Sequence, residues 1–247
     1  MKYLQKVIHQ DYLLYTKVKK MLKSKISSGA YDAELRRVYV TDSAVAEQRE
    51  RYVSLASMFE EEYGENDALS FYSAPGRTEV CGNHTDHNNG KVIAAAIDRD
   101  VIAVAAKNDD GKIRFTSEGY GEISISLADT ENPDNFENYT SAALIAGVVN
   151  GFEKSGYGVG GYDAYSTTEV LRGSGISSSA AFEVMIGNIL NYTYNEGKVS
   201  NEEIAKISQY SENEYFGKPC GLMDQMACAV GGFVYIDFEN SGEPFVE

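Results

Sequence analysis

The sequence predicts an α+β fold, in which strand-like segments are followed by helical ones. Apolar runs of strand-like pattern begin at residue 68, and apolar residues at helical spacing follow from residue 141. The chain has 247 residues, of which 43% are hydrophobic and 24% charged. This size and composition suffice for a buried core in one large domain or in one and a half ordinary ones.

Ahead of the strands, the N-terminal region shows helical spacing. Two sets of apolar residues each share one helix face: Leu4, Ile8, Tyr12 and Tyr15, then Tyr52, Leu55, Phe59 and Tyr63. Gly64 ends the second helix, and a loop signal at residues 25–30 separates the two. We expect residues 1–66 to form a helical N-terminal extension, an appendage that either packs against the rest of the chain or mediates self-association.

The sheet is expected to begin after this extension. Short apolar runs predict strands over 68–72, 92–97, 101–106 and 113–116. Asp110-Gly111 is a strong signal for a hairpin turn before the last of these strands. Ile123, Ile125 and Leu127 then alternate with polar or small residues, as in a half-buried strand, and a helix is expected over 141–152.

The second half of the sequence predicts a strand, a glycine-serine loop and two helices. A strand over 162–170 leads into the loop, and the helix after it buries one apolar face. Ser200 and Glu203 form a capping box at the start of the next helix. An apolar strand over 233–238 follows, and the last residues leave its edge without a partner. We therefore expect the chain to be the front part of a longer protein.

Charge and cysteine content restrict the kind of partner. The formal charge of −15 and the lack of any lysine- or arginine-rich run argue against binding to nucleic acid or a membrane surface. No apolar stretch approaches membrane-spanning length, and Lys6, His9, Gln10 and Asp11 interrupt the apolar run that a signal peptide needs. Cys81, Cys220 and Cys228 match neither a metal-binding spacing nor a disulfide framework, so a cytoplasmic location is expected. A small ligand is the expected partner, and a nucleotide is compatible with the acidic charge because backbone N–H groups, a helix N-terminus and a divalent metal can hold phosphate.

The first candidate site is the loop from Gly173 to Ser179. Its alternating glycines let the backbone approach a ligand closely, and its serine hydroxyls can donate to phosphate or bind a metal. The helix that follows directs its positive N-terminal dipole to the same place. The loop is not a Walker loop, because G-x-x-x-x-G-K-[ST] does not occur in the chain. The alternative interpretation is a flexible loop with a serine helix cap.

The second candidate site is the segment 77–90, which holds His84, Asp86 and His87. Metal binding is one interpretation, but a third soft ligand at suitable spacing is lacking. The run of hydroxyl, amide, imidazole and carboxylate groups suits a polyhydroxylated substrate, since each sugar hydroxyl needs both a donor and an acceptor. The remaining alternative is a solvated loop between two strands.

The third candidate site lies within residues 212–225. Asp224 follows Cys-Gly-Leu-Met, an apolar setting in which a carboxylate can hold the proton of a substrate hydroxyl. Glu212, at the end of the preceding helix, is a suitable ligand for Mg²⁺. The alternatives are that Glu212 and Glu214 belong to a solvated helix face and that Asp224 is a helix N-cap.

Together these segments resemble the galactokinases and their relatives among the GHMP kinases, over roughly residues 70–238 and in the family order. The family's substrate signature, approximately G-R-x-N-x-I-G-E-H-x-D-Y-x-x-G, is met by Gly76, Arg77, Gly82, His84, Asp86 and Gly90. Its nucleotide loop, close to P-L-G-x-G-L-S-S-S-A, is met by Gly173, Gly175, Ser177, Ser178, Ser179 and Ala180. Its segment P-C-G-x-M-D-Q is met by Pro219, Cys220, Gly221, Met223, Asp224 and Gln225.

The resemblance implies that residues 67–247 form a GHMP-kinase N-terminal domain, with helices packed on a mixed sheet. It also implies a kinase that transfers the γ-phosphate of ATP to the anomeric hydroxyl of galactose, giving galactose 1-phosphate. Another monosaccharide is the alternative substrate. A sugar- and ATP-binding sensor without turnover is the alternative function.

The resemblance further implies a role for each site residue. The phosphates of ATP would lie on Gly173, Ser174, Gly175, Ser177, Ser178 and Ser179. Mg²⁺ would be held by Glu212 with Ser178 or Ser179. As catalytic residues, Asp224 would take or orient the hydroxyl proton of the sugar and Arg77 would stabilise charge on the moving phosphoryl group. The sugar would contact Arg77, Glu79, Asn83, His84, Asp86 and Asp224.

The sequence departs from the family pattern at three signature positions and after residue 238. Asn83 stands where the family has Glu, Glu79 where it has Asn, and His87 where it has Tyr. We hypothesise that Glu79 partly replaces the acceptor that Asn83 lacks and that His87 adds a pH-dependent contact. The glycine-rich segment of the family's C-terminal domain does not follow residue 238, so that domain is expected to be absent. The 247-residue chain is then expected to bind nucleotide weakly and to turn over little or not at all.

Overall fold

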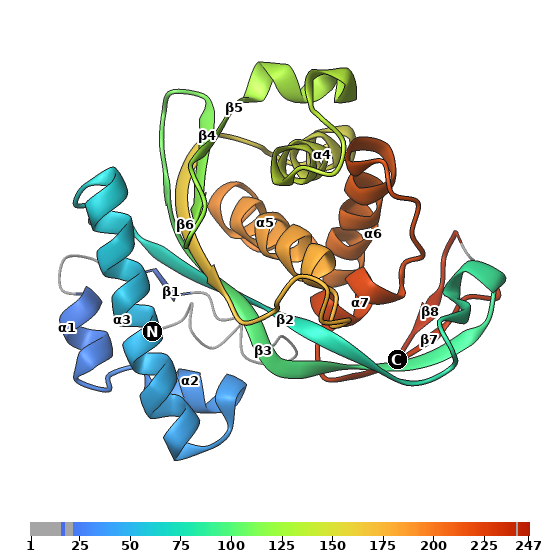
Figure 1. Ribbon diagram of the computed structural model, residues 1–247, viewed down its shortest axis with the longest axis horizontal. Helices are drawn as coiled ribbons and strands as arrows, with labels where there is room; N and C mark the ends of the chain where they lie inside the picture. Colours follow the sequence, from blue (N-terminus) through green and yellow to red (C-terminus); the bar gives the residue numbers. More distant parts are fainter. Residues whose placement is uncertain (1–15, 18–21, 241) are drawn as a thin grey trace.

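The computed structural model describes residues 16–17, 22–240 and 242–247 as one sheet with helices on both faces (Figure 1). The helix face predicted from Leu4, Ile8, Tyr12 and Tyr15 lies outside the described residues. The strands are β1 (Thr16–Lys17), β2 (Ser70–Cys81), β3 (Lys91–Lys107), β4 (Lys112–Ser117), β5 (Ile123–Ser126), β6 (Tyr162–Thr168), β7 (Phe233–Asp237) and β8 (Phe245–Val246). The helices are α1 (Leu22–Ser27), α2 (Asp32–Tyr39), α3 (Asp42–Tyr63), α4 (Ser141–Lys154), α5 (Ser178–Tyr194), α6 (Asn201–Ser211) and α7 (Met223–Val230).

The sheet is mixed, in the order β1-β2-β3-β6-β4-β5, and β7 pairs with β3 and with β8. Only β4 and β6 run parallel; the other described pairs are antiparallel. The strands predicted over 92–97 and 101–106 are one strand, β3, because its first part pairs with β7 and its last part with β6. The predicted α+β fold with a mixed sheet is confirmed.

Three strand predictions are wrong. Asp110-Gly111 does turn the chain, but β3 and β4 form no hairpin, since β6 lies between them and pairs with both through Tyr165. Residues 16–17, expected to be helical, form β1 because their backbone pairs with β2. The edge of β7, expected to lack a partner, pairs with β8. In the first two cases a backbone partner far along the chain decided the outcome, and local turn or helix signals carry no information about that partner. In the third case the partner is the short strand β8, 8 to 10 positions further on.

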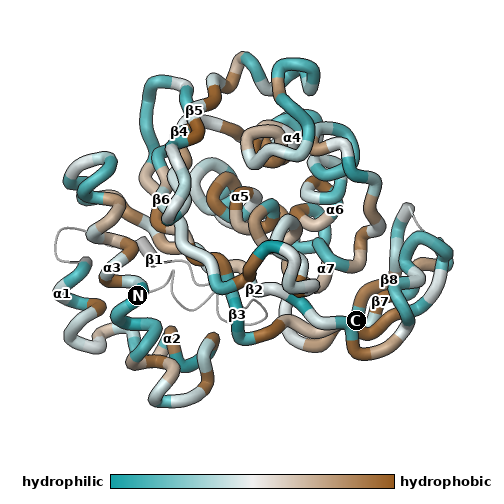
Figure 2. The backbone as a smooth tube through the Cα atoms, in the orientation of Figure 1, coloured by the Kyte–Doolittle hydropathy of each residue, from teal (hydrophilic) through white to brown (hydrophobic). Residues whose placement is uncertain are grey.

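Helices α1–α3 cover one face of the sheet. Successive residues of β3 point to opposite faces, so Ile102 and Val104 pack with Leu55 and Phe59 of α3, whereas Val101 and Ala103 face the other core. Figure 2 colours parts of both α3 and α5, which flank the sheet, as hydrophobic. The helical extension is therefore present in the described residues, and it packs against the rest of the chain, the first of its two expected roles, as one side of the fold.

A buried polar network ties these helices to the sheet. The carboxylate of Asp100, 3% exposed, accepts hydrogen bonds from Tyr39 Oη at 2.6 Å and Ser73 Oγ at 2.6 Å, and pairs with Arg51 Nη1 at 2.5 Å. Arg51 also donates to the main-chain oxygen of Asp100 at 3.1 Å. A buried carboxylate is tolerated only when its oxygens are paired in this way.

Helices α4–α7 form the layer on the opposite face and position the candidate site (Figure 1). Gly147 lets α4 approach α6 closely: a Cβ there would lie 2.4 Å from Ser211 Oγ. Ser200 caps α6 at the predicted position: its Oγ accepts from Glu203 N at 3.2 Å, which is the serine half of the predicted capping box. None of the helices in the described part of the chain combines the length and the apolar character needed to cross a bilayer.

Candidate active site

The three candidate segments meet where β2, the glycine-serine loop and α7 come together. Arg77 lies on β2, and its main-chain N donates to Ile176 O of the loop at 3.2 Å. Gly76 makes this approach possible, because a Cβ at that position would lie 2.7 Å from the same oxygen. The strand and the loop therefore hold each other in place through their backbones.

Arg77 and Asp224 form a bidentate ion pair at this junction. Arg77 Nε lies 2.7 Å from Asp224 Oδ1 and Nη2 lies 2.8 Å from Oδ2. Arg77 Nη1 donates to Gly175 O at 2.9 Å, and Ser177 Oγ donates to Asp224 Oδ2 at 2.6 Å. The planar guanidinium thus binds the carboxylate and the loop at once.

Asp224 is held as a carboxylate by its neighbours. Burial alone would raise the pKa of Asp224, but the hydrogen bonds from Arg77 and Ser177, with the charges of Arg77 and His84, hold that pKa below its usual value. Asp224 lies in the first turn of α7, where the helix N-terminus also favours negative charge. The alternative that Asp224 is the N-cap is wrong, since Leu222 occupies that position.

The signature segment forms a tight turn beside this pair. Asn83 and His84 are both left-handed, with φ of 55° and 53°. Glu79 Oε1 accepts from the main-chain N of His84 at 3.0 Å and so stabilises the turn. His84 Nε2 then lies 3.3 Å from Arg77 Nη2 and 3.8 Å from Asp224 Oδ1, while Asn83 is exposed.

Asp86 joins the turn to α7. It is 8% exposed, and its Oδ2 accepts from the main-chain N of Met223 at 3.2 Å. Gly221 is required beside it, because a Cβ there would lie 1.8 Å from the same oxygen. His87 Nδ1 lies 3.4 Å from Asp86 Oδ1. A carboxylate distant in sequence therefore caps the start of α7, and one of its oxygens is committed to that contact.

The glycine-serine loop adopts the backbone that its residue types permit. Gly173 and Gly175 both have φ of 77°, and Ser177 has φ of 62° immediately before α5. The loop borders a cavity of about 770 Å³ between the sheet and the N-terminal ends of α4 and α5. Gly173, Ser178 and Ser179 line this cavity. Ser174 instead donates to Leu171 O at 2.5 Å, and Ser177 and Gly175 contact the Arg77–Asp224 pair.

Glu212 is buried on the wall of the same cavity. It is 2% exposed, at the start of a π-helical turn, Glu212–Phe216, that extends α6. Its Oε1 accepts from Ser179 Oγ at 3.0 Å and Lys218 Nζ at 2.9 Å, and its Oε2 from Gln225 Nε2 at 2.8 Å. The hydrogen bond to Glu212 raises the pKa of Lys218. The alternative of a solvated helix face is thus wrong for Glu212 but holds for Glu214, which is exposed.

Of the three metal ligands predicted from the sequence, the structure brings only two into direct contact. Ser179 contacts Glu212, whereas Ser178 shares the cavity wall with it. Among the described residues, no three His, Cys, Asp or Glu side chains gather closely enough to hold a metal ion by themselves. A cation at Glu212 would therefore need hydroxyl, water or ligand oxygens to complete its coordination.

Comparison with known proteins agrees with this geometry. Residues 57–107 match the galactokinase galactose-binding signature, and residues 141–232 match the N-terminal domain of the GHMP kinases. The two matches lie in the order in which the sequence motifs occur along the chain. The resemblance inferred from the three motifs is confirmed.

Galactokinases are among its relatives. The chain is 36% identical over 172 residues to the galactokinase of Clostridium tetani. The aligned region covers 68% of this chain and 42% of that protein. It is 34% identical over 183 residues to the galactokinase of Bacillus subtilis, covering 72% of this chain and 45% of that protein. The chain thus spans about half the length of the curated relatives it matches.

Solved structures show the same fold. The galactokinase of Lactococcus lactis, in complex with galactose, superimposes with a TM-score of 0.73 at 26% identity, over 79% of this chain and 51% of that one. A heptose 1-phosphate kinase superimposes with a TM-score of 0.60 at 21% identity, over 72% of this chain and 59% of that one, and shares the fold.

The structure brings several further residues to the site that the sequence motifs do not indicate. Lys218 and Arg172 are the cationic side chains on the cavity wall, and Ser141 begins α4 there. Gln225 matches the last position of the P-C-G-x-M-D-Q segment, and the structure shows that its side chain donates a hydrogen bond to Glu212. A lysine six positions after Glu212 carries no local signal for this contact, since the chain must reverse between them.

Proposed function

We propose that this chain carries the ATP- and sugar-binding part of a galactokinase, which transfers the γ-phosphate of ATP to the anomeric hydroxyl of galactose. The observation that carries the proposal is the bidentate Arg77–Asp224 pair, which joins the glycine-serine loop to the sugar-signature turn. Phosphoryl transfer needs a nucleotide and a hydroxyl aligned at one place, and this pair lies between the two segments that suit them. Residues 67–247 would form the catalytic domain, with residues 1–66 as its helical extension.

Asp224 would accept the hydrogen bond of the anomeric hydroxyl. Because its pKa is held low, Asp224 is a weak base that orients the hydroxyl and takes its proton only as the oxygen bonds to phosphorus. The new O–P bond then forms as the bond between the γ-phosphorus and the β-phosphate oxygen breaks, and ADP leaves. Arg77 would stabilise the negative charge on the transferred group.

The cavity suits the nucleotide. Its wall combines the N-termini of α4 and α5, the loop glycine Gly173, the hydroxyls of Ser178 and Ser179 and the cations Lys218 and Arg172. Helix N-termini and backbone N–H groups bind phosphate, and the two cations offset the acidic character of the chain. Gly175, Ser174 and Ser177 would lie along the phosphates at the side that faces Arg77.

Glu212 fits a magnesium ion. Its carboxylate is buried beside the hydroxyl of Ser179 on the cavity wall, and hard oxygen donors of this kind suit Mg²⁺ together with water and phosphate oxygens. We propose Glu212 with Ser179 as the protein ligands, and Ser178 as a neighbouring hydroxyl. The ion would neutralise charge on the phosphates of ATP.

The sugar would bind against the signature turn. His84 and Asp86 lie beside the catalytic pair, and Glu79 holds the turn that presents them. The Lactococcus lactis protein was solved with galactose, which supports galactose as the first candidate among the monosaccharides. A cytoplasmic location is also proposed, supported by the three free thiols of Cys81, Cys220 and Cys228.

A calorimetric titration of the 247-residue chain with a panel of monosaccharides tests the proposal. We expect galactose to bind more tightly than glucose, N-acetylgalactosamine or arabinose, and Asp224→Ala to abolish the galactose signal. Because the 247-residue chain is expected to turn over little or not at all, the transfer itself is tested on the full-length protein, by measuring galactose-dependent release of ADP and formation of galactose 1-phosphate. A folded chain that binds none of these sugars would contradict the proposal.

A further inference from the structure

A buried amide lies directly behind Glu212. Gln225 follows Asp224 in α7 and is 0% exposed, as is Glu183 of α5. Neither side chain is among the residues that line the nucleotide cavity. Burying an amide and a carboxyl together is costly unless each makes defined hydrogen bonds, so their contacts need an explanation.

Gln225 spans two carboxyl groups from two helical segments. Its Nε2 donates to Glu212 Oε2 at 2.8 Å and to Glu183 Oε2 at 3.3 Å. An amide nitrogen has two hydrogens, so it can serve both oxygens at once. The opposite orientation of the amide would turn its oxygen toward Glu212 Oε2, which accepts at 2.8 Å, and Glu212 therefore determines which way Gln225 faces.

The two carboxyl groups have different surroundings. Glu212 has Lys218 and Ser179 at its other oxygen, whereas Glu183 Oε1 is buried without a hydrogen-bond partner among the described residues. Gln225 Oε1 is also buried and unpartnered among them. Glu183 thus does not line the cavity, and among the described residues its side chain is hydrogen-bonded to Gln225.

We propose that Gln225, held in place by Glu183, is the positioning residue of Glu212 in metal and nucleotide binding. By binding Oε2, the amide stops the carboxylate from rotating and keeps Oε1 on the cavity side, beside Ser179 and Lys218. Such outer contacts orient the ligands of a metal, and their loss typically lowers metal affinity about 10- to 100-fold. The inference rests on the proposed function.

The test measures how much Mg²⁺ strengthens the binding of ADP to the 247-residue chain. Calorimetric titrations with and without Mg²⁺ give this gain for the wild type, Gln225→Met and Gln225→Asn. Methionine keeps the volume but removes the donor, and asparagine keeps the amide but shortens its reach. We expect the Mg²⁺-dependent gain to fall at least about tenfold in whichever of these variants folds, with metal-free ADP affinity within about twofold of the wild type.

Two further variants separate positioning from packing. Glu183→Gln keeps an acceptor for Gln225 Nε2 and should retain the gain, whereas Glu183→Met removes the acceptor and should lower it. Gln209→Met is the matched control, because the Gln209 side chain donates to Cys220 O at 3.1 Å, and only the main-chain oxygen of Gln209, which the substitution keeps, accepts from Glu212 N. A Gln225 variant that folds and keeps the full Mg²⁺-dependent gain in ADP affinity overturns this inference but leaves the proposed function standing. A wild-type chain that binds no ADP overturns the proposed function, and the inference with it.

Discussion

Arg77 and Asp224 are 147 positions apart in the sequence, and the structure joins them through two parallel hydrogen bonds of 2.7 and 2.8 Å. Arg77 is 7% exposed, and the side chain of Asp224 is 30% exposed. The pair therefore opens to solvent on the Asp224 side, where a ligand hydroxyl can reach the carboxylate while the guanidinium stays fixed behind it.

The stability that this pair contributes should depend on pH. The pKa of Asp224 is below its usual value in the folded chain, so the contribution is present above the unfolded pKa, about 3.9, and is lost as pH falls through the folded value. We expect Arg77→Met to lower the free energy of unfolding by about 1–3 kcal/mol at pH 7, and by less in acid. Urea denaturation of both proteins at pH 7 and near pH 3 measures the difference. A pH-independent difference would show that the ion pair is not its source.

Gly221→Ala should disturb both stability and sugar binding. A Cβ at this position would lie 1.8 Å from Asp86 Oδ2, so Asp86 must move and the cap on α7 is lost. We expect a loss of about 1–3 kcal/mol in the free energy of unfolding and weaker galactose binding. Gly121→Ala is the control for stability, since a Cβ there meets nothing within 4 Å. Equal stabilities of the two variants would contradict the proposed contact.

Tyr39→Phe should loosen the attachment of α2 to the sheet. It removes the 2.6 Å hydrogen bond to the buried carboxylate of Asp100, and hydrogen bonds to charged groups contribute about 1.5–3 kcal/mol. Chemical denaturation measures the loss, with Tyr120→Phe as a control on an exposed tyrosine. Identical midpoints for the two variants would show that Asp100 does not need this donor.

Lys218→Met should weaken nucleotide binding. The lysine is bonded to Glu212 at 2.9 Å and lines the cavity, so its loss removes a cation from the place where phosphates are proposed to bind. We expect ADP affinity to fall about tenfold, which corresponds to about 1.4 kcal/mol. Lys198→Met, which removes a lysine paired with Glu196 on the surface, is the control in the same titration. If both variants bind ADP alike, Lys218 is not a nucleotide contact.

Glu79→Asn should lower sugar affinity, as hypothesised from its place in the signature. The structure adds a reason: Glu79 Oε1 accepts from the main-chain N of His84 and supports two successive left-handed residues. The shorter asparagine would release this turn and with it His84. Galactose titration of Glu79→Asn and Glu79→Gln measures the effect, and glutamine, which keeps the acceptor, should be the milder change. Unchanged affinity in the asparagine variant would refute the hypothesis.

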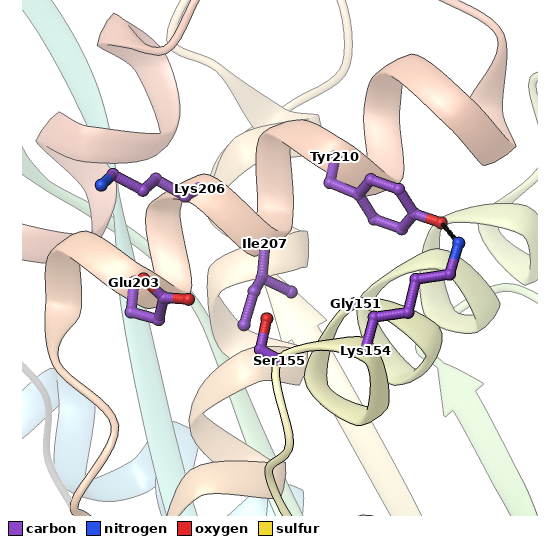
Figure 3. A pocket seen from close by; sticks show the side chains of 7 residues that line it. All are labelled: Gly151, Lys154, Ser155, Glu203, Lys206, Ile207 and Tyr210. Atoms are coloured by element: carbon purple, nitrogen blue, oxygen red, sulfur yellow. Dashed lines mark hydrogen bonds between the residues drawn. The ribbon is translucent and has the colours of Figure 1, made fainter. Parts of the chain in front are cut away.

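A second, smaller surface hollow differs from the nucleotide cavity in the groups that line it. It measures about 180 Å³ and lies between α4 and α6, lined by residues that include Lys154, Lys206 and Tyr210 (Figure 3). Lys154 Nζ donates to Tyr210 Oη at 2.6 Å, and Tyr210 in turn donates to Asn150 Oδ1 at 2.9 Å. These groups bind one another, whereas the larger cavity brings helix N-termini, hydroxyls and cations to one place.

The sequence by itself determined the local elements and the residue types of the candidate site. Helix α6 begins at the predicted Ser200 cap, and α4, β5 and β6 lie where the apolar spacing predicts them. Residues within about four positions of each other decide such features. The three motifs also predicted which side chains meet, because Arg77, His84 and Asp224 do lie together.

Only the tertiary structure decided what depends on partners far along the chain. It placed β6 between β3 and β4, laid α1–α3 against the second face of the sheet, and buried Glu212 while leaving Glu214 exposed. Two glutamates two positions apart look alike in sequence, and the contacts of Ser179, Lys218 and Gln225 distinguish them. Strand order and buried polar contacts are selected by packing across the whole chain, and local spacing does not record that packing.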